Sequence, residues 1–234
     1  MIMDRIIVIT GTRKGIGRFL AEYYLEQGFT VIGCSRDLSD LLPNNYEHYC
    51  LDISDEPAVI KMIGSIVKKH KRIDYLLNNA GIASMNHSLL TPLKTVEQIF
   101  KTNFLGTFLF CREVGKVMSR HKSGRIVNFT TVAVPLRIAG ESVYAASKAA
   151  VESLTRIIAK EFGKNGITCN AIGPSPIMTD LIKNVDKGKI MQLLEQQAIP
   201  QFAEFGDVAN LIDFFLSGNS KMITGQIIYL GGIS

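Results

Sequence analysis

Short runs of apolar, β-branched residues alternate along the chain with longer segments in which apolar side chains recur every three or four positions. Several of the short runs are apolar at every position, which is typical of strands in a parallel sheet covered by helices on both faces. The runs predict strands over residues 5–10, 30–35, 47–52, 73–79, 124–130, 166–172 and 225–230. The longer segments predict helices near residues 16–27, 55–70, 95–121, 142–163, 187–197 and 206–217.

This alternation predicts the class of fold. Strand–helix units repeated in this order form a parallel sheet with helices packed on it. We therefore expect an α/β fold, a Rossmann-like doubly wound parallel sheet of about seven strands with helices on both faces. The least regular stretch is 173–203, where prolines surround a short predicted helix. Since no linker, low-complexity run or internal repeat divides the sequence, we expect a single domain over residues 1–234.

Composition and charge exclude some classes of partner. The content of 47% hydrophobic and 20% charged residues is that of a globular protein. The net charge of +5 includes two basic clusters, residues 68–72 and 119–125. Both clusters fall at the ends of predicted helices, where cations stabilise the helix dipole. Aromatic residues that would stack on bases are not interleaved with them, so we expect no nucleic acid as a partner.

The sequence carries no mark of secretion or membrane insertion. Residues 1–10 contain Asp4 and Arg5 and lack a basic region and a cleavage site, so we expect no signal peptide. No apolar run reaches the length of a membrane span. The cysteines have no redox or zinc spacing, which predicts buried apolar roles, no metal and a cytoplasmic protein. These cysteines are Cys34, Cys50, Cys111 and Cys169.

A glycine-rich turn follows the first predicted strand and opens the first predicted helix. Gly11, Gly15 and Gly17 have the spacing GxxxGxG. Glycine permits torsions and close approach that a Cβ would block, and the N–H groups at a helix start bind phosphate. Because it follows the first strand of an alternating chain, the turn predicts a nucleotide-binding site rather than a plain strand–helix connection.

Five motifs, in order along the chain, carry a resemblance to a known family. They are "TGTRKGIG" (residues 10–17), "NNAG" (78–81), "KTNFLGTF" (101–108), "YAASK" (144–148) and "NAIGPSPIMT" (170–179). Their content and spacing resemble the classical short-chain dehydrogenases/reductases over nearly the whole chain. The resemblance implies an NAD(P)-binding Rossmann fold, a hydride-transfer activity and a homodimer or homotetramer.

Tyr144 and Lys148 stand four residues apart in a predicted helix and therefore share one of its faces. An ammonium near a phenol lowers the pKa of the phenol, which suits proton transfer near neutral pH. By resemblance, Tyr144 is the catalytic acid or base, and Lys148 holds the nicotinamide ribose and lowers the pKa of Tyr144. The resemblance also makes Asn103 the support of a water that links Lys148 to solvent. Alone, such a tyrosine–lysine pair is also typical of an exposed helix face.

Thr131 occupies the position of the catalytic serine that the family usually has before the tyrosine. It keeps the hydroxyl and adds a methyl with a stiffer χ1, so we expect it to bind the substrate carbonyl in a narrower pocket. The alternative is that Thr131 is only a β-branched residue at a strand end. Two further departures, Ser175 in place of glycine and Leu230 in place of aspartate, are expected to alter loops near the cofactor or a subunit interface.

The end of the second predicted strand bears on the choice of cofactor. Ser35 stands where NAD-preferring members of the family have aspartate, and Arg36 follows it. Arginine suits a phosphate because its planar fork donates two hydrogen bonds. Arg13 and Lys14 in the glycine-rich turn also resemble NADP-preferring members, whereas Asp37 is a counter-signal. Together these residues favour NADP(H), with NAD(H) as the alternative.

The resemblance extends the expected site to further positions. Asp52 is similar to the residue that contacts adenine in the family. Because ligands bind at the carboxyl ends of the strands, residues 81–90, 132–142 and 176–203 are expected to line the substrate pocket, where Arg137 would meet an anionic group or face solvent. The other expected cofactor contacts are Gly11, Thr12, Gly15, Ile16, Gly17, Ile53, Asn79, Ala80, Gly81, Pro174, Ser175, Ile177 and Thr179, together with Tyr144 and Lys148.

These observations predict an NADP(H)-dependent oxidoreductase that transfers a hydride between nicotinamide and a carbonyl or secondary alcohol. A sugar derivative, an oxoacyl thioester, a steroid or a small ketone would each fit as the substrate. The alternatives are a nucleotide-binding regulatory or scaffold protein with lapsed chemistry, and an isomerase or dehydratase of the family's extended branch. A homo-oligomer is expected because residues 95–121 and 142–163 carry surplus apolar side chains: Phe104, Phe108, Val151, Leu154 and Ile158.

Overall fold

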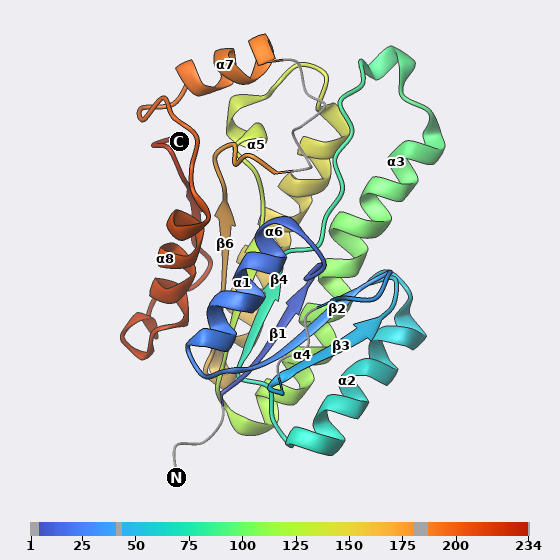
Figure 1. Ribbon diagram of the computed structural model, residues 1–234, viewed down its shortest axis with the longest axis vertical. Coiled ribbons are helices and arrows are strands. Elements are labelled where there is room, and N and C mark those ends of the chain that lie inside the picture. Colours follow the sequence, from blue (N-terminus) through green and yellow to red (C-terminus); the bar gives the residue numbers. More distant parts are fainter. Residues whose placement is uncertain (1–4, 41–43, 180–186, 234) are drawn as a thin grey trace.

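The computed structural model describes residues 5–40, 44–179 and 187–233. Seven parallel strands form one sheet in the order β3-β2-β1-β4-β5-β6-β7 (Figure 1). This sheet confirms the predicted fold class, and each strand lies where the apolar runs placed it. The strands are β1 (Ile6–Thr10), β2 (Thr30–Ser35), β3 (Tyr46–Cys50), β4 (Tyr75–Asn78), β5 (Gly124–Phe129), β6 (Ile167–Gly173) and β7 (Ile227–Tyr229).

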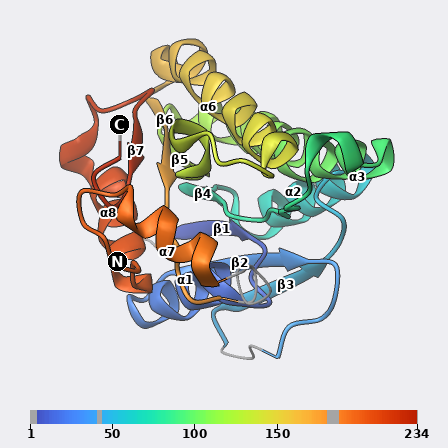
Figure 2. The same cartoon turned by 90° about the horizontal axis from the view of Figure 1, so that it is seen from above.

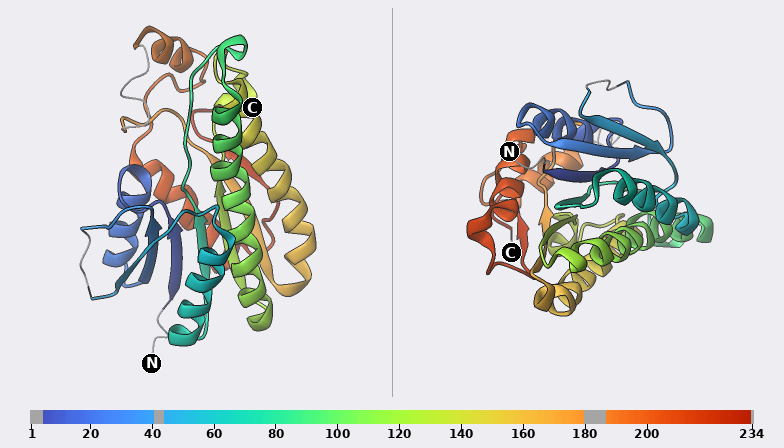
Figure 3. Two further views of the ribbon diagram at one scale, coloured as in Figure 1. Left: turned by 90° about the vertical axis from the view of Figure 1, so that its right-hand side faces the viewer. Right: turned by 90° about the horizontal axis from the view of Figure 1, so that it is seen from below.

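Helices cover both faces of the sheet (Figure 2). On one face α2, α4 and α6 pack against the strands, and on the other face lie α1 and α8. The long α6 also packs beside α3 (Figure 3). The helices are α1 (Gly15–Glu26), α2 (Glu56–His70), α3 (Leu93–Phe100), α4 (Thr107–His121), α5 (Ala133–Leu136), α6 (Ser142–Phe162), α7 (Lys187–Glu195) and α8 (Phe205–Leu216).

The continuous apolar runs are explained by burial on both faces. All five residues of β1 are buried. Ile6 and Val8 belong to the hydrophobic core beneath α2, α4 and α6, whereas Ile7 and Ile9 belong to the core beneath α1 and α8. Successive side chains of a strand point to opposite faces, so a strand between two helical layers has to be apolar throughout.

The predicted helix over residues 95–121 is interrupted. A π-helical segment, Lys101–Gly106, separates α3 from α4. Within it, the carbonyl oxygen of Asn103 accepts a hydrogen bond from the Thr107 hydroxyl at 2.7 Å. Single π-helical turns are often found at functional sites, and this one carries the asparagine of the third motif.

Several short elements have no counterpart in the sequence-based expectation. The four-residue α5 is too short to display a helical period. Single turns of 3₁₀ helix span Ser88–Leu90, Gly163–Asn165 and Gly218–Ser220. Both α5 and the predicted α7 lie beyond the carboxyl ends of the strands (Figure 1) and contribute residues to the cavity described below.

Burial tests the expectations about cysteine and about surplus apolar residues. Cys50 is exposed because it ends the edge strand β3, so the prediction of burial is wrong for this cysteine and correct for the other three. Val151 and Ile158 are buried within their own subunit's core, so they are not the surplus apolar residues that the sequence suggested. Ile157, which is 52% exposed, is the apolar residue that α6 presents outward.

The basic clusters lie as expected, in the last turns of α2 and α4. Within the described ranges, none of the helices combines the length and the apolar character that crossing a membrane would require.

Candidate active site

A cavity of about 1120 Å³ opens at the carboxyl ends of the strands. It lies where the strand order reverses between β1 and β4, the usual ligand position in a doubly wound sheet. All of the expected catalytic and cofactor-binding residues line this cavity except Thr12, Gly17 and Asn103. The five motifs are therefore brought to one place.

The glycine-rich turn is fixed from behind by Asn79. Its Nδ2 donates hydrogen bonds to the carbonyl oxygens of Thr10 at 2.9 Å and Gly11 at 3.4 Å. Gly17 is required because a Cβ there would lie 2.2 Å from the Gly11 carbonyl oxygen. The N-cap position of α1 makes no side-chain capping hydrogen bond in the described structure. The first N–H groups of α1 are thus left for a pyrophosphate, so the turn fits a dinucleotide.

Tyr144 and Thr131 meet on one wall of the cavity. Tyr144 lies in the first turn of α6, and Thr131 follows β5. The pKa of Tyr144 is raised to about 12: burial raises it most, the Thr131 side chain lowers it, and the Glu141 carboxylate raises it. The Thr131 hydroxyl oxygen also accepts a hydrogen bond from the Ala133 N–H at 3.2 Å. One lone pair of Thr131 is therefore engaged, and its proton can be donated to the phenol oxygen.

Lys148 lies one turn further along α6 and is only 4% exposed. Its Nζ donates to the carbonyl oxygen of Phe129 at 2.8 Å, and burial lowers the pKa of the ammonium to about 8. The pKa of Tyr144 is set by burial, Thr131 and Glu141 rather than by Lys148. The expectation that Lys148 lowers the pKa of Tyr144 is therefore wrong for this arrangement, because the ammonium is directed to the end of β5.

Asn103 connects the π-helical segment to the loop after β4. Its Oδ1 accepts from the Ile82 N–H at 2.9 Å, and its Nδ2 donates to the Ile82 carbonyl at 2.9 Å and to the Ser147 hydroxyl at 3.0 Å. A Cβ at Gly81 would lie 3.3 Å from both Asn103 Oδ1 and Lys148 Nζ. Asn103 thus holds the loop against Lys148, and its support of a water stays a prediction.

The far end of the cavity carries the residues expected to choose the cofactor. Ser35, Arg36 and Asp37 follow one another at the end of β2 and line the cavity. The carboxylate of Asp37 pairs with the Arg13 guanidinium at 3.4 Å. Asp37, the residue whose acidic side chain argued for NAD(H) in the sequence, is thus directed to a basic residue of the glycine-rich turn.

Asp52 remains charged at the cavity wall. Burial raises the pKa of its carboxyl, but hydrogen bonds from the Ser54 hydroxyl and N–H, together with the charges of Lys101 and Arg36, lower it further, so that the net pKa lies below its usual range. The Oδ1 atom accepts from the Ser54 N–H at 2.9 Å and from its hydroxyl at 2.6 Å. Asp52 is thereby oriented, and its contact with adenine stays a prediction.

The departures at positions 175 and 230 have structural partners. The buried Ser175 hydroxyl donates to Gln197 Oε1 at 2.5 Å. Gln197 packs against Gly231, where a Cβ would lie 2.0 Å from the same oxygen. The Leu230 N–H donates to the Gly173 carbonyl at 2.9 Å. Ser175 therefore ties the loop after β6 to the segment that follows α7.

The sequence left two alternatives open for Arg137, of which the structure supports the solvent-facing one, and several other residues were missed. Arg137, at a φ of 52°, is exposed and does not line the described cavity. Parts of all three expected loops line it, and residues 180–186 lie outside the described residues. Glu141 was missed, although its position one turn before Tyr144 was a usable signal. The polar face of α3 and the segment after it were also missed: Lys94, Glu97, Gln98, Lys101 and Thr102.

The fold and the cavity define a doubly wound α/β protein in which Thr131, Tyr144 and Lys148 line one cavity with the glycine-rich turn. Comparison with known proteins identifies its family. A family model described as Enoyl-(Acyl carrier protein) reductase matches residues 11–233. The 3-oxoacyl-[acyl-carrier-protein] reductase FabG of Staphylococcus epidermidis is 31% identical, with 98% of each chain covered.

Solved structures agree with this relationship. The structure of ElxO with NADP bound has a TM-score of 0.89, is 31% identical and covers 97% of each chain. The aldohexose dehydrogenase of Thermoplasma acidophilum has a TM-score of 0.88, is 27% identical and covers 98% of this chain and 93% of its own. The chain belongs to the short-chain dehydrogenase/reductase family and is an oxidoreductase, as predicted. NADP(H) is the cofactor that these comparisons favour.

Proposed function

We propose that the chain transfers a hydride between NADP(H) and a carbonyl or secondary alcohol, with Tyr144 as the general acid or base. The observation that carries the proposal is the convergence of Thr131, Tyr144 and Lys148 on the wall of the cavity that the glycine-rich turn also lines. Nicotinamide, when bound, supplies or accepts the hydride. The protein's own task is to bind the substrate oxygen and to move one proton.

The pKa values favour the reductive direction at neutral pH. Because burial raises the pKa of Tyr144 to about 12, the phenol keeps its proton and can donate it to an oxygen that gains negative charge. Thr131 donates a hydrogen bond to the same oxygen and stabilises that charge. In the oxidative direction Tyr144 has to lose its proton, and the hydrogen bond from Thr131 supports the phenolate. Lys148, whose Nζ approaches Gly81 together with Asn103 Oδ1, is the group proposed to hold the nicotinamide ribose, and Asn103 is proposed to support a water that links Lys148 to solvent.

The preference for NADP(H) is proposed on the charges at the end of β2. Arg36 and Arg13 place two guanidinium groups at the cavity wall beside the Ser35 hydroxyl. Guanidinium groups bind phosphate through charge-assisted, often bidentate hydrogen bonds. The carboxylate of Asp37, which would repel a 2′-phosphate, pairs with Arg13.

The test is a screen of substrates against both cofactors. The relatives are named for a 3-oxoacyl thioester and an aldohexose, so the panel contains a 3-oxoacyl thioester, aldohexoses and a small diketone, each with the NADP and NAD couples. We expect turnover, followed at 340 nm, for at least one member with the NADP couple. Tyr144→Phe is expected to bind NADPH as before and to lose turnover. Tight NADPH binding without turnover of any member would instead support the regulatory protein with lapsed chemistry.

We also propose a cytoplasmic homo-oligomer. The outward-facing Ile157 of α6 and the exposed Leu105 beside α4 are the apolar side chains that a second copy would cover. The four cysteines are free thiols, which suits a reducing compartment. Light scattering at micromolar concentration tests the assembly, and a monomeric mass contradicts it.

A further inference from the structure

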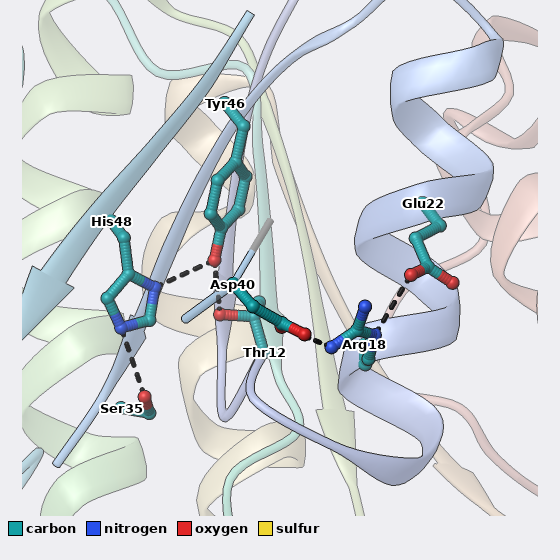
Figure 4. Close-up of polar contacts among 7 residues, drawn as sticks. All are labelled: Thr12, Arg18, Glu22, Ser35, Asp40, Tyr46 and His48. Carbon is teal, nitrogen blue, oxygen red and sulfur yellow. Dashed lines mark hydrogen bonds and ion pairs between the residues drawn. The ribbon is translucent and has the colours of Figure 1, made fainter. Parts of the chain in front are cut away.

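A chain of side-chain hydrogen bonds runs from the glycine-rich turn to the end of β2 (Figure 4). The Thr12 hydroxyl lies 2.8 Å from the Tyr46 hydroxyl, which lies 2.7 Å from His48 Nδ1. His48 Nε2 in turn lies 3.0 Å from the Ser35 hydroxyl. Gly33 makes room for this chain, because a Cβ there would lie 2.3 Å from the Tyr46 hydroxyl and 2.4 Å from Thr12 Oγ1.

The available donors and acceptors fix the direction of these hydrogen bonds. The Asp37 carbonyl can only accept, and it receives the Ser35 proton at 2.6 Å. Ser35 Oγ must then accept from His48 Nε2–H, which leaves Nδ1 as an acceptor for the Tyr46 proton. Burial raises the pKa of Tyr46, so its phenol keeps this proton, and Thr12 donates to the phenol oxygen. With the proton on Nε2 of His48, every group in the chain has a hydrogen-bond partner.

His48 holds both neighbours of Arg36. Its Nε2 lies 3.0 Å from Ser35 Oγ and also 3.0 Å from the Asp37 carbonyl oxygen. Arg36 stands between these two residues and is the arginine proposed to bind the 2′-phosphate. The turn that presents Arg36 is therefore fixed on both sides by one imidazole on the neighbouring strand β3.

The same geometry determines when the Ser35 hydroxyl can donate a hydrogen bond to a phosphate. A phosphate oxygen accepts hydrogen bonds, but the single proton of Ser35 is given to the Asp37 carbonyl. If the Ser35 hydroxyl turns to the phosphate, His48 Nε2–H is already within 3.0 Å of that carbonyl and can take over its hydrogen bond. Without His48, Ser35 would have to leave the Asp37 carbonyl unpaired or keep its proton away from the phosphate.

We propose that His48 is a positioning residue for recognition of the cofactor's 2′-phosphate: it fixes the turn around Arg36 and frees the Ser35 hydroxyl to donate to that phosphate. This inference rests on the proposed use of NADP(H). The proposed role of His48 concerns only the phosphate that distinguishes NADPH from NADH. Loss of His48 is therefore expected to weaken the binding of NADPH and to leave the binding of NADH unchanged.

The test measures dissociation constants of NADPH and NADH by fluorescence titration, which needs no substrate. His48→Phe is expected to weaken NADPH binding about fivefold or more, the range of one lost hydrogen bond, and NADH binding less than about twofold. His48→Gln restores an N–H donor and is expected to recover most of the NADPH affinity. If His48→Phe is unstable, His48→Ala carries the same forecast.

A matched control and a double variant complete the test. His121 also lies 3.0 Å from a backbone carbonyl, that of Lys71, far from the cavity, and His121→Phe is expected to leave both affinities unchanged. Because His48 acts partly through Ser35, the effects of His48→Phe and Ser35→Ala on NADPH are expected to be less than additive.

Three results would overturn the inference. His48→Phe could weaken the binding of NADPH and NADH equally, or weaken the binding of neither, or its effect on NADPH binding could add strictly to that of Ser35→Ala. A wild-type protein that binds NADH as tightly as NADPH would overturn the proposed cofactor preference and this inference together. A wild-type preference for NADPH that survives His48→Phe but is lost in Arg36→Ala would overturn this inference alone.

Discussion

The hydroxyl of Thr131 provides the most detailed prediction. Thr131→Val preserves the shape and the χ1 preference of the side chain and removes only the hydroxyl. In the structure this hydroxyl accepts a hydrogen bond from the Ala133 N–H at 3.2 Å, and its side chain lowers the pKa of Tyr144. The substitution therefore has separate consequences for stability and for chemistry.

The two consequences differ in size. The Ala133 N–H loses an acceptor in a buried position, which is expected to lower the free energy of unfolding by about 1–3 kcal/mol. Loss of one preorganised donor to the reacting oxygen is expected to lower kcat by about a hundredfold or more. The Thr131 side chain lowers the pKa of Tyr144, so its removal is also expected to move the limb of the oxidative pH–rate profile along which the rate rises with pH to higher pH.

The assay is steady-state kinetics of wild type, Thr131→Val and Thr131→Ser across pH, with NADPH titration as the control for folding. Thr131→Ser keeps the hydroxyl and is expected to retain most of the activity. Thr131→Val with wild-type kcat and an unshifted pH profile would refute the role of this residue and leave it as a β-branched strand-end residue.

Three further predictions concern the cofactor, the pH dependence and the loop after β6. Arg36→Ala is expected to weaken the binding of NADPH by about 1.5–3 kcal/mol and to leave the binding of NADH almost unchanged. Equal losses of affinity for the two cofactors in a titration would contradict the assignment of Arg36 to the 2′-phosphate. Burial raises the pKa of Glu141, so its ionisation opposes folding and stability falls as pH rises from the unfolded-state pKa through the folded-state pKa. Glu141→Gln is thus expected to raise Tm at about pH 8 and not at about pH 4, and an equal Tm difference at both would reject this. Ser175→Gly removes the 2.5 Å bond to Gln197 and is expected to lower stability in urea by about 1–3 kcal/mol; unchanged stability would show that this bond is weak.

The sheet could be predicted because its strands are buried on both faces, as β1 shows with residues in both cores. The motif residues could be placed together because strands that share one direction end at one edge. The π-helical segment around Asn103 could not be predicted, because it depends on hydrogen bonds to Ile82, which is distant in sequence.

Other parts of the site depend on tertiary packing in the same way. Val151 and Ile158 read as surplus apolar residues until the structure placed them in the core. The pKa of Tyr144 was expected to fall because Lys148 is near in sequence, but burial and the direction of the ammonium reverse that expectation. His48 binds Tyr46 on its own strand β3, Ser35 at the end of β2 and Asp37 after it, and the sequence does not show that β2 and β3 pair in this register.

The central claim is that hydride transfer occurs in this cavity with Tyr144 supplying the proton. The most direct measurement uses NADPH deuterated at the transferring position and follows the label by mass spectrometry into the alcohol formed from the best carbonyl of the panel. The account predicts one deuterium on the carbinol carbon with wild type and none with Tyr144→Phe, although this variant still binds NADPH. Alcohol formed without the label, or equal labelling by Tyr144→Phe, would contradict it.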